Sequence, residues 1–422
     1  MLLLLFLIAS AGFAAEARSA VTFDRDVLPI LQKNCQNCHR PGEIGPMALL
    51  TYADTRPWAK AIKSAVITKK MPPWFADPRY GHFKNDRTLN GADLRKIVDW
   101  VDGGALEGDA QDKPAPIQWP EGWDIQPDAV LQMPDPYTVP STGLLQYVYV
   151  VFPTGFARDT YITAAEVRPG NRSAVHHAVA LVRPPGSQWL KEAKPFVPYI
   201  PPVGAGGQPD DPHFAPQTLV SYSAGMQAQR FDMDDSAFLI PAGSDIVLQL
   251  HYVANGHSAA VDRTKIGLTF ASAPPRKVLF SFAALSWDWA IPPGNPNYEG
   301  HAELTLRSPV ELVFVQSHMH RRGKDMTVQL EFPDGKSETV LRVPHYDFNW
   351  QLIYYLDKPL ALPQGTRVRV TAHWDNSASN PNNPDPSMTV RWGDQSWDEM
   401  LSAPLGVIVD RSAGGGLLTR NE

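Results

Sequence analysis

Residues 173–182, "SAVHHAVALV", form a run of aliphatic and β-branched residues that predicts a buried β-strand. Two histidines, His176 and His177, stand next to each other in this run. Side chains alternate between the two faces of a strand, so neighbouring imidazoles converge only where the strand twists or carries a β-bulge. A buried imidazole also needs a polar partner. The stretch therefore predicts a β-rich fold and a functional reason for the paired histidines.

The rest of the chain after about residue 144 repeats this strand pattern. Short β-branched or aromatic runs alternate with Gly, Pro and Asn, as in "LLQYVYVVF" (144–152), "DIVLQLHYV" (245–253) and "TRVRVTAHW" (366–374). Forty prolines in 422 residues favour turns and β-architecture over long helices. We expect two antiparallel β-sandwiches, over residues 141–275 and 276–422.

The charge and cysteine content exclude several classes of protein. The net charge is −6 and no long basic run occurs, so neither a nucleic acid nor an anionic membrane is an evident partner. Cys35 and Cys38 are the only cysteines, so no disulfide framework holds the β-rich part.

Residues 1–20 look like a secretory signal peptide. They open with "MLLLLFLIASAGF" and continue with small residues around the cleavage-like pattern Ala15-Glu16-Ala17. The positive residues that usually precede the apolar run are missing, so a retained membrane anchor is the alternative to cleavage. No later segment is long and apolar enough to span a bilayer. We expect a periplasmic or secreted protein.

The motif Cys35-Gln36-Asn37-Cys38-His39 predicts covalent attachment of a c-type haem. Two thiols one helical turn apart can form thioethers with the haem vinyl groups, and the adjacent imidazole can bind the iron. Half of a zinc site and a redox C-x-x-C are the alternatives. A zinc site lacks a second cysteine pair here, and a redox motif should follow a strand, whereas residues 22–35 predict an amphipathic helix.

Two more predicted helices complete a small all-α cytochrome c domain over residues 21–109. One runs from about Thr55 to Lys69, and the other, "NGADLRKIVDWVDGG", begins after Asn90. Met71 follows the first of them in an extended segment and is the favoured second axial ligand, with Met47 as the alternative. Residues 110–140 are rich in proline and predict a linker that lies along the next domain.

Three further histidines lie where strands can present them to a metal ion. In residues 245–253, alternation places His251 on the face opposite the strand's isoleucine and leucines. In "VFVQSHMHRRGKDM" (313–326), His318 and His320 are two residues apart and share a face. A lone histidine is more often structural, but these residues together with the 176–177 pair predict metal binding.

The residue types favour copper. Imidazole-rich sites without thiolate or clustered carboxylate suit copper, and a thioether favours Cu(I). Zinc hydrolysis is the alternative, but such sites usually combine three ligands with a carboxylate base, and the chain has no H-E-x-x-H motif.

As an ordered set, four segments resemble the copper type II, ascorbate-dependent monooxygenases, a family that includes the peptidylglycine and dopamine monooxygenases. They are "HHAV", "LQLHYVANG", "SHMHRRGK" and "HWDNSASNPNNPDPSMTVRWGDQSWDEM". The likeness is closer to bacterial members with a c-type cytochrome domain in front. It implies two jelly-roll-like domains with one copper each on a solvent-filled cleft.

The resemblance also implies ligands for each copper. His176, His177 and His251 would bind the electron-transferring copper, and His318, His320 and Met400 the oxygen-activating copper. Met388 is the other methionine near Met400 in sequence, but it begins an apparent strand and could simply pack. Residues that recognise a peptide carboxylate or a catecholamine cannot be matched, so the resemblance leaves the substrate open.

The sequence thus predicts an exported haem c-fused dicopper monooxygenase that uses O2 to hydroxylate a small organic substrate. Ascorbate or a redox protein would supply the electrons. One alternative is a non-catalytic periplasmic electron-transfer or copper-handling protein with β-sandwich docking domains. Another is a carbohydrate-binding sandwich tethered to a cytochrome.

Overall fold

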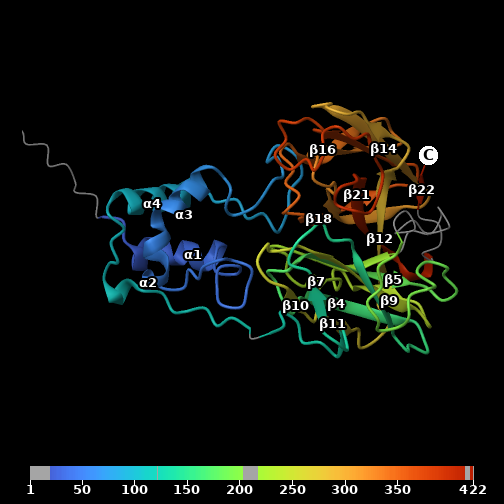
Figure 1. Ribbon diagram of the computed structural model, residues 1–422, viewed down its shortest axis with the longest axis horizontal. Helices are drawn as coiled ribbons and strands as arrows, with labels where there is room; N and C mark the ends of the chain where they lie inside the picture. The colour runs from blue at the N-terminus through green and yellow to red at the C-terminus, as the bar shows by residue number, and fades with distance from the viewer. Residues whose placement is uncertain (1–19, 121, 203–216, 414–418, 422) are drawn as a thin grey trace, which may run out of the picture. The chain divides into compact units, whose positions relative to one another are not determined.

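The computed structural model describes residues 20–120, 122–202, 217–413 and 419–421 (Figure 1). The chain forms two compact units, Met1–Pro72 with Leu89–Ile117, and Pro73–Thr88 with Gln118–Glu422. The first is helical and the second is almost entirely β, so the protein is mainly β with a small helical N-terminal region. No helix in the described part combines the length and apolar character that a membrane span requires. The predicted signal peptide falls on residues 1–19, outside the described residues, and on residue 20.

The helical unit contains helices where the sequence predicts them. They are η1 (Phe23–Val27), α1 (Leu28–Asn34), α2 (Tyr52–Thr55), η2 (Arg56–Trp58), α3 (Ala59–Ile67), α4 (Gly91–Asp102) and η3 (Ala110–Asp112). The helix predicted from about Thr55 starts earlier and is interrupted by the 3-10 turn at Pro57. Asn90 caps α4 as expected, because its side chain accepts hydrogen bonds from the backbone of Ala92 and Asp93.

The β unit contains a nine-stranded sheet, a five-stranded sheet, a four-stranded sheet and two two-stranded sheets. Along the nine-stranded sheet the order is β1 (Ala129–Gln132), β11 (Lys265–Phe270), β4 (Thr160–Arg168), β8 (Ser236–Ile240), β12 (Lys277–Ser286), β21 (Leu401–Asp410), β15 (Val310–Gln316) and β18 (Ile353–Leu362), with β7 (Gln229–Arg230) beside β4.

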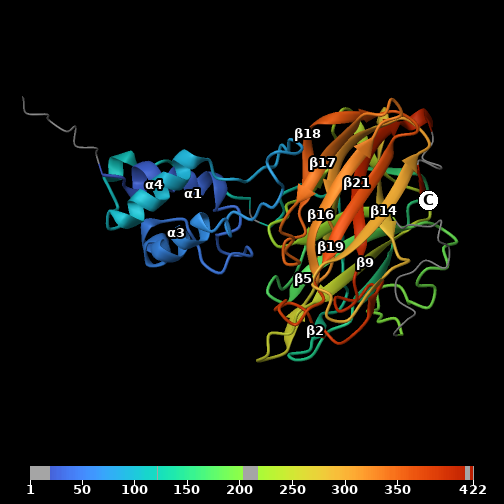
Figure 2. The ribbon, with the colours of Figure 1, turned by 90° about the horizontal axis from the view of Figure 1, so that it is seen from above.

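Four other sheets complete the unit. The four-stranded sheet has the order β3 (Val148–Pro153), β9 (Asp245–Tyr252), β5 (Val175–Arg183) and β6 (Gln217–Ser223). The five-stranded sheet has the order β17 (Ser337–Val343), β16 (Gly323–Glu331), β19 (Arg367–Trp374), β14 (Tyr298–Leu306) and β22 (Thr419–Asn421), and its first four strands run side by side in Figure 2. The small pairs are β10 (Ala260–Asp262) with β2 (Tyr137–Val139), and β13 (Ala290–Ile291) with β20 (Val390–Arg391). The 3-10 turn η4 (Arg411–Ala413) follows β21.

Two hydrophobic cores share the central strands. One core joins the four-stranded sheet to β11, β4 and β8, and the other joins the five-stranded sheet to β12, β21, β15 and β18. Along β12, Leu279 belongs to the first core, whereas Val278 and Phe280 belong to the second. Figure 1 shows β12 and β21 between β14 and β16 on one side and β5 and β9 on the other. Strands buried on both faces explain the nearly continuous apolar runs in this region.

The structure differs from the expected boundaries in three places. Residues 73–88, included in the predicted 21–109 domain, belong to the β unit, where the Asp77 amide donates to the Arg342 carbonyl at 2.8 Å. The predicted linker 110–140 contains strands β1 and β2, because its polar stretches are interrupted by short segments that pair with β11 and β10. The predicted boundary at 275/276 falls within one sheet, since β8 pairs in parallel with β12.

Candidate metal centres

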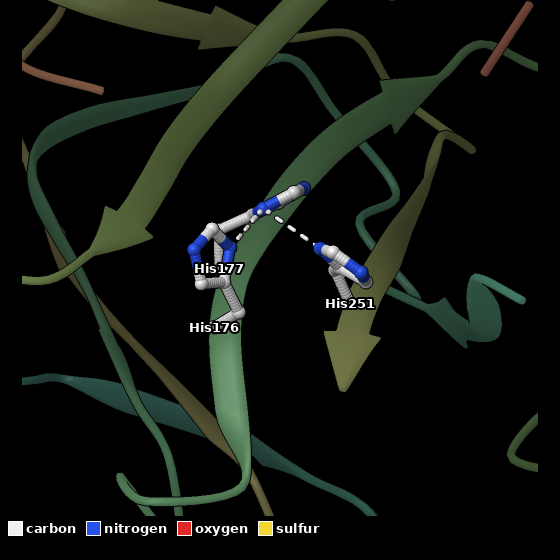
Figure 3. A group of neighbouring side chains, drawn as sticks. All are labelled: His176, His177 and His251. Atoms are coloured by element: carbon white, nitrogen blue, oxygen red, sulfur yellow. Dashed lines mark hydrogen bonds between the residues drawn. The ribbon is translucent and has the colours of Figure 1, made fainter. Parts of the chain in front are cut away.

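Three histidines converge on adjacent strands of the four-stranded sheet (Figure 3). His176 and His177 lie on β5, and His251 lies on β9 directly opposite His177. The register shifts between Val175 and His177, so the bulge expected for the paired histidines is present. His177 Nδ1 is 3.2 Å from His176 Nδ1 and 3.4 Å from His251 Nδ1. One ring nitrogen from each residue lies within 4.8 Å of the others, and we call these three residues the tri-histidine group.

The surroundings keep the tri-histidine group neutral. Burial lowers the pKa of His177 and of His251 well below the usual value, and nearby imidazoles lower it further. Burial also lowers the pKa of His176. A neutral imidazole carries one N–H, so His177 Nδ1 cannot donate a hydrogen bond to both neighbours. A metal ion between the three nitrogens would satisfy all of them, so these residues fit a metal.

A neighbouring amide orients one of these rings. The Asn349 side-chain oxygen lies 3.4 Å from His176 Nε2, an arrangement that places the hydrogen on Nε2 and leaves the Nδ1 lone pair free. The ring of buried Tyr147 packs edge-on against His177 and His251, with centroids 5.5 and 4.9 Å apart.

His318, His320 and Met400 form a second candidate group, which we call the His-Met group. His318 lies just beyond β15 and pairs through its backbone with Ser402 of β21. The rings of His318 and His320 have centroids 5.3 Å apart and stand at 90° to each other. The expected alternation holds, because the intervening Met319 side chain is buried in the second core. Met400 immediately precedes β21 and lines the same cavity as both histidines.

Hydrogen bonds orient both rings of the His-Met group in the same way. His318 Nδ1 lies 2.8 Å from the Gln351 side-chain oxygen, and His320 Nδ1 lies 3.2 Å from the Asp398 carbonyl. Both Nε2 atoms are therefore left as free acceptors. His320 Nε2 is buried and has no hydrogen-bond partner in the described structure. Burial lowers the pKa of His320 to about 3. A neutral, oriented and unpartnered imidazole fits a soft metal ion beside a thioether.

The backbone around His320 rests on the buried Glu399. Its carboxylate accepts hydrogen bonds from the amides of His320 and Arg322 and from the Trp374 indole. Burial raises the pKa of Glu399 to about 7. Met388, the alternative methionine, is 56% exposed and does not line the cavity, whereas Met400 does. Met226 also lines the cavity, from the segment between β6 and β7.

The two candidate groups meet at one cavity of about 160 Å³ in the β unit, although only His177 of the tri-histidine group lines it. His177 lines it from the four-stranded sheet, and the His-Met group lines it from the ends of β15 and β21. Phe348 lies between the groups: its ring stacks on His176 at 4.9 Å and lies 6.0 Å from that of His320.

The sequence did not identify the loop that connects the groups. Phe348, Asn349 and Gln351 lie between β17 and β18, in a stretch whose residue types follow no recognisable spacing. The side-chain amides of Asn349 and Gln351 contact the histidines only because the fold brings this loop beside them.

The C-x-x-C-H segment forms a turn at the end of α1. Cys35 caps α1, and the amides of Cys38 and His39 donate to the Cys35 carbonyl at 3.1 and 2.9 Å, so the segment makes one tight turn. The two cysteines do not form a disulfide. A Cβ on Gly45 would come within 2.7 Å of His39 Nδ1, so the loop closes tightly over that ring.

A backbone carbonyl orients the His39 ring. Its Nδ1 lies 3.2 Å from the Met47 carbonyl, which leaves Nε2 as the free nitrogen. Residue 47 therefore lies on the Nδ1 side of the ring. Met71, which the sequence favours as second axial ligand, follows α3 and is half-buried.

Comparisons with known proteins leave the family open. No family model and no curated protein matches the chain. Among solved structures, the major capsid protein P2 from bacteriophage PM2 has 8% identity and a TM-score of 0.27, over 66% of this chain and 97% of that chain. PNGF-II has 8% identity and a TM-score of 0.28, over 67% and 65%. VP2 of infectious bursal disease virus has 11% identity and a TM-score of 0.18, over 72% and 77%. These scores are too low to define a fold or a function.

Proposed function

We propose that this protein is an exported dicopper monooxygenase with a fused c-type cytochrome domain. It would hydroxylate a C–H bond of a small organic substrate, within two jelly-roll-like β-sandwich domains that hold one copper each. The shared cavity carries the proposal, because His177 of an all-imidazole group and His318, His320 and Met400 of a mixed group line the same space. Two sites with different ligands suit different tasks, electron storage and O2 reduction.

The reaction balances as R–H, O2, two electrons and two protons giving R–OH and water. Copper held by His318, His320 and Met400 would supply the one-electron redox chemistry that O2 reduction requires. The chain's own residues prepare that site: the Gln351 side-chain oxygen and the Asp398 carbonyl leave each Nε2 free, and His320 is fully buried. His176, His177 and His251 would hold the ion that stores the second electron.

Electrons would enter from ascorbate or a redox protein, supplied or relayed by a covalent haem c. Cys35 and Cys38 would hold the haem by thioethers, with His39 and Met71 as axial ligands. The signal-like start of the chain supports a periplasmic or secreted location, where haem attachment of this type takes place.

Oxygen consumption tests the proposal. The full chain, expressed with cytochrome c maturation and loaded with copper, should consume O2 with ascorbate when an extract of small organic molecules is present. Untargeted product analysis with ¹⁸O2 should find one labelled oxygen per product. Labelled product formed equally by copper-free protein would contradict the copper assignment, and copper binding without any labelled product would support the non-catalytic alternative.

Haem oxidation tests the role of the helical unit. Denatured protein should keep a haem absorption band, because thioether bonds survive denaturation. When pre-reduced protein is mixed with O2 and substrate, the haem should oxidise at a rate that requires copper. Equal oxidation in copper-free protein would show that the haem does not feed the copper groups.

A further inference from the structure

The walls of the shared cavity define what it can bind. Its apolar surface comes from Leu219, Met226, Phe231, Leu279, Phe314 and Ile353. The remaining lining residues apart from the metal groups are mostly hydroxyl and amide side chains from β6, β7, β9, β12 and β15. None of the lining residues in the described part of the chain is Asp, Glu, Lys or Arg.

A wall without charged side chains discriminates against charged ligands. A carboxylate or ammonium ion that leaves water needs an opposite charge or several hydrogen bonds to offset its desolvation. A neutral molecule loses much less on entry and gains from contact with the aromatic and aliphatic surface. The cavity therefore lacks the features that a peptide carboxylate or a protonated amine requires.

Besides His320 Nε2, the wall contains a second buried polar atom without a partner in the described structure. The Ser223 hydroxyl is buried without a hydrogen-bond partner, and the residue is 2% exposed. Ser223 lines the cavity and lies opposite His177 in the pairing of β6 with β5. A buried hydroxyl without a partner is costly, so a ligand that hydrogen-bonds to it would gain affinity.

The volume limits the size of the ligand. The cavity measures about 160 Å³. An apolar cavity of about 150 Å³ accommodates a molecule the size of benzene. Room therefore exists for one small ring or a short branched chain with a polar substituent.

We propose that the substrate is a small uncharged molecule of about the size of a benzene derivative, with an apolar body and a hydrogen-bonding group held by Ser223. The role of this molecule as a substrate rests on the proposed hydroxylation, but its binding can be measured without turnover. The reacting C–H bond would lie toward His318, His320 and Met400, because these residues line the same cavity as Ser223.

Three ligands of nearly equal size test the charge preference: benzyl alcohol, benzoate and benzylammonium. Their affinities for the copper-loaded, full-length protein are measured without O2 at pH 7 by calorimetry. We expect benzyl alcohol to bind at least tenfold more tightly than either ion. Benzoate or benzylammonium binding as tightly as benzyl alcohol would overturn the proposal, as would failure of all three to bind.

Two serine variants test the hydrogen bond. Ser223→Ala should weaken benzyl alcohol binding three- to tenfold and leave the copper content, measured by mass spectrometry, unchanged. Ser244→Ala is the matched control, because Ser244 is 1% exposed and its hydroxyl is also unpartnered, but it does not line the cavity. Equal affinities in the two variants would remove Ser223 from the binding site.

Turnover separates this inference from the proposed function. Selective binding of benzyl alcohol with copper-dependent formation of an ¹⁸O-labelled product supports both. Selective binding of the neutral ligand with no O2 consumption supports the cavity assignment and contradicts the hydroxylation of this class of molecule.

Discussion

The tri-histidine group and the His-Met group are assembled in different ways. In the first, strand pairing brings the side chains together: His177 and His251 are direct neighbours in register, and a bulge turns His176 toward them. In the second, the candidate ligands lie just outside strands β15 and β21, and the rings are oriented by hydrogen bonds that they donate to the Gln351 side-chain oxygen and the Asp398 carbonyl. The comparison teaches that register alone can build an all-imidazole site, whereas a mixed site depends on loop contacts.

Removal of the thioether should have the largest effect. Met400→Ala should fold, keep the copper of the tri-histidine group and lose at least a hundredfold in hydroxylation rate, because a soft sulfur ligand favours the Cu(I) state that reacts with O2. Met388→Ala is the control, since Met388 is 56% exposed and lies away from the cavity. Copper content and product formation are measured on both. A more severe loss in the Met388 variant would reverse the ligand assignment.

Removal of an orienting amide should come next. Gln351→Leu should weaken copper binding at the His-Met group by about 10- to 100-fold, because His318 loses the acceptor for its Nδ1 hydrogen. Gln351→Glu keeps an acceptor and should restore most of the affinity. Gln249→Leu is the control, because Gln249 also lines the cavity but bonds to the Tyr149 hydroxyl at 2.9 Å. Copper titration followed by electron paramagnetic resonance distinguishes the sites, and equal weakening in all three variants would argue for a packing effect.

The tri-histidine group should make the stability of the copper-free protein depend on pH. The folded-state pKa of His177 and His251 lies well below the usual value of about 6.5. Below pH 6.5 the unfolded chain binds these protons and the folded chain does not, so stability falls as the pH falls. Each imidazole contributes a slope of up to about 1.4 kcal/mol per pH unit. Urea unfolding of a His177→Gln, His251→Gln variant between pH 5 and 6.5 should therefore show a flatter dependence.

Glu399 gives the His-Met group an opposing contribution. Burial raises the pKa of this carboxyl to about 7, so the folded state holds its proton while the unfolded state has lost it above about pH 4.3. This part of the stability falls as the pH rises through that window. Glu399→Gln should therefore make the loss of stability on acidification steeper than in the wild type. An unchanged slope would mean that Glu399 is ionised in the folded protein.

The aromatic ring between the groups should have the smallest effect. Phe348→Leu should lower the free energy of unfolding by about 1 kcal/mol through the lost ring contacts, and it should weaken copper binding a few-fold at both groups. Phe196→Leu is the control, since Phe196 is exposed, belongs to neither group and contacts the ring of Phe152. Weakening at only one group would show that Phe348 does not connect them.

The strand pattern predicted which way the histidines face because alternation is local, whereas the grouping of His251 with His176 and His177 was implied by the family resemblance. Alternation placed His251 away from the aliphatic core, and the adjacency of His176 and His177 required the bulge that the structure contains. The helix that Asn90 caps was also predicted, because a cap depends on residues that are close in sequence.

The contacts that the sequence did not predict are long-range. Gln351 reaches His318 across 33 positions, and Asn349 reaches His176 across 173. The pairing of β8 with β12 and the placement of residues 73–88 in the β unit also depend on tertiary packing. No periodicity in a single chain encodes such contacts, and the unpartnered Ser223 hydroxyl became visible only once β6 was placed beside the cavity.

X-ray absorption at the copper edge tests the central claim most directly. The account predicts two copper ions per chain in the wild type and one in a His251→Ala variant that retains the His-Met group. The reduced variant should show two nitrogen ligands and one sulfur ligand on its copper, and Met400→Ala should remove the sulfur. A single copper in the wild type, or a variant spectrum without sulfur, would contradict the assignment of two different copper groups on one cavity.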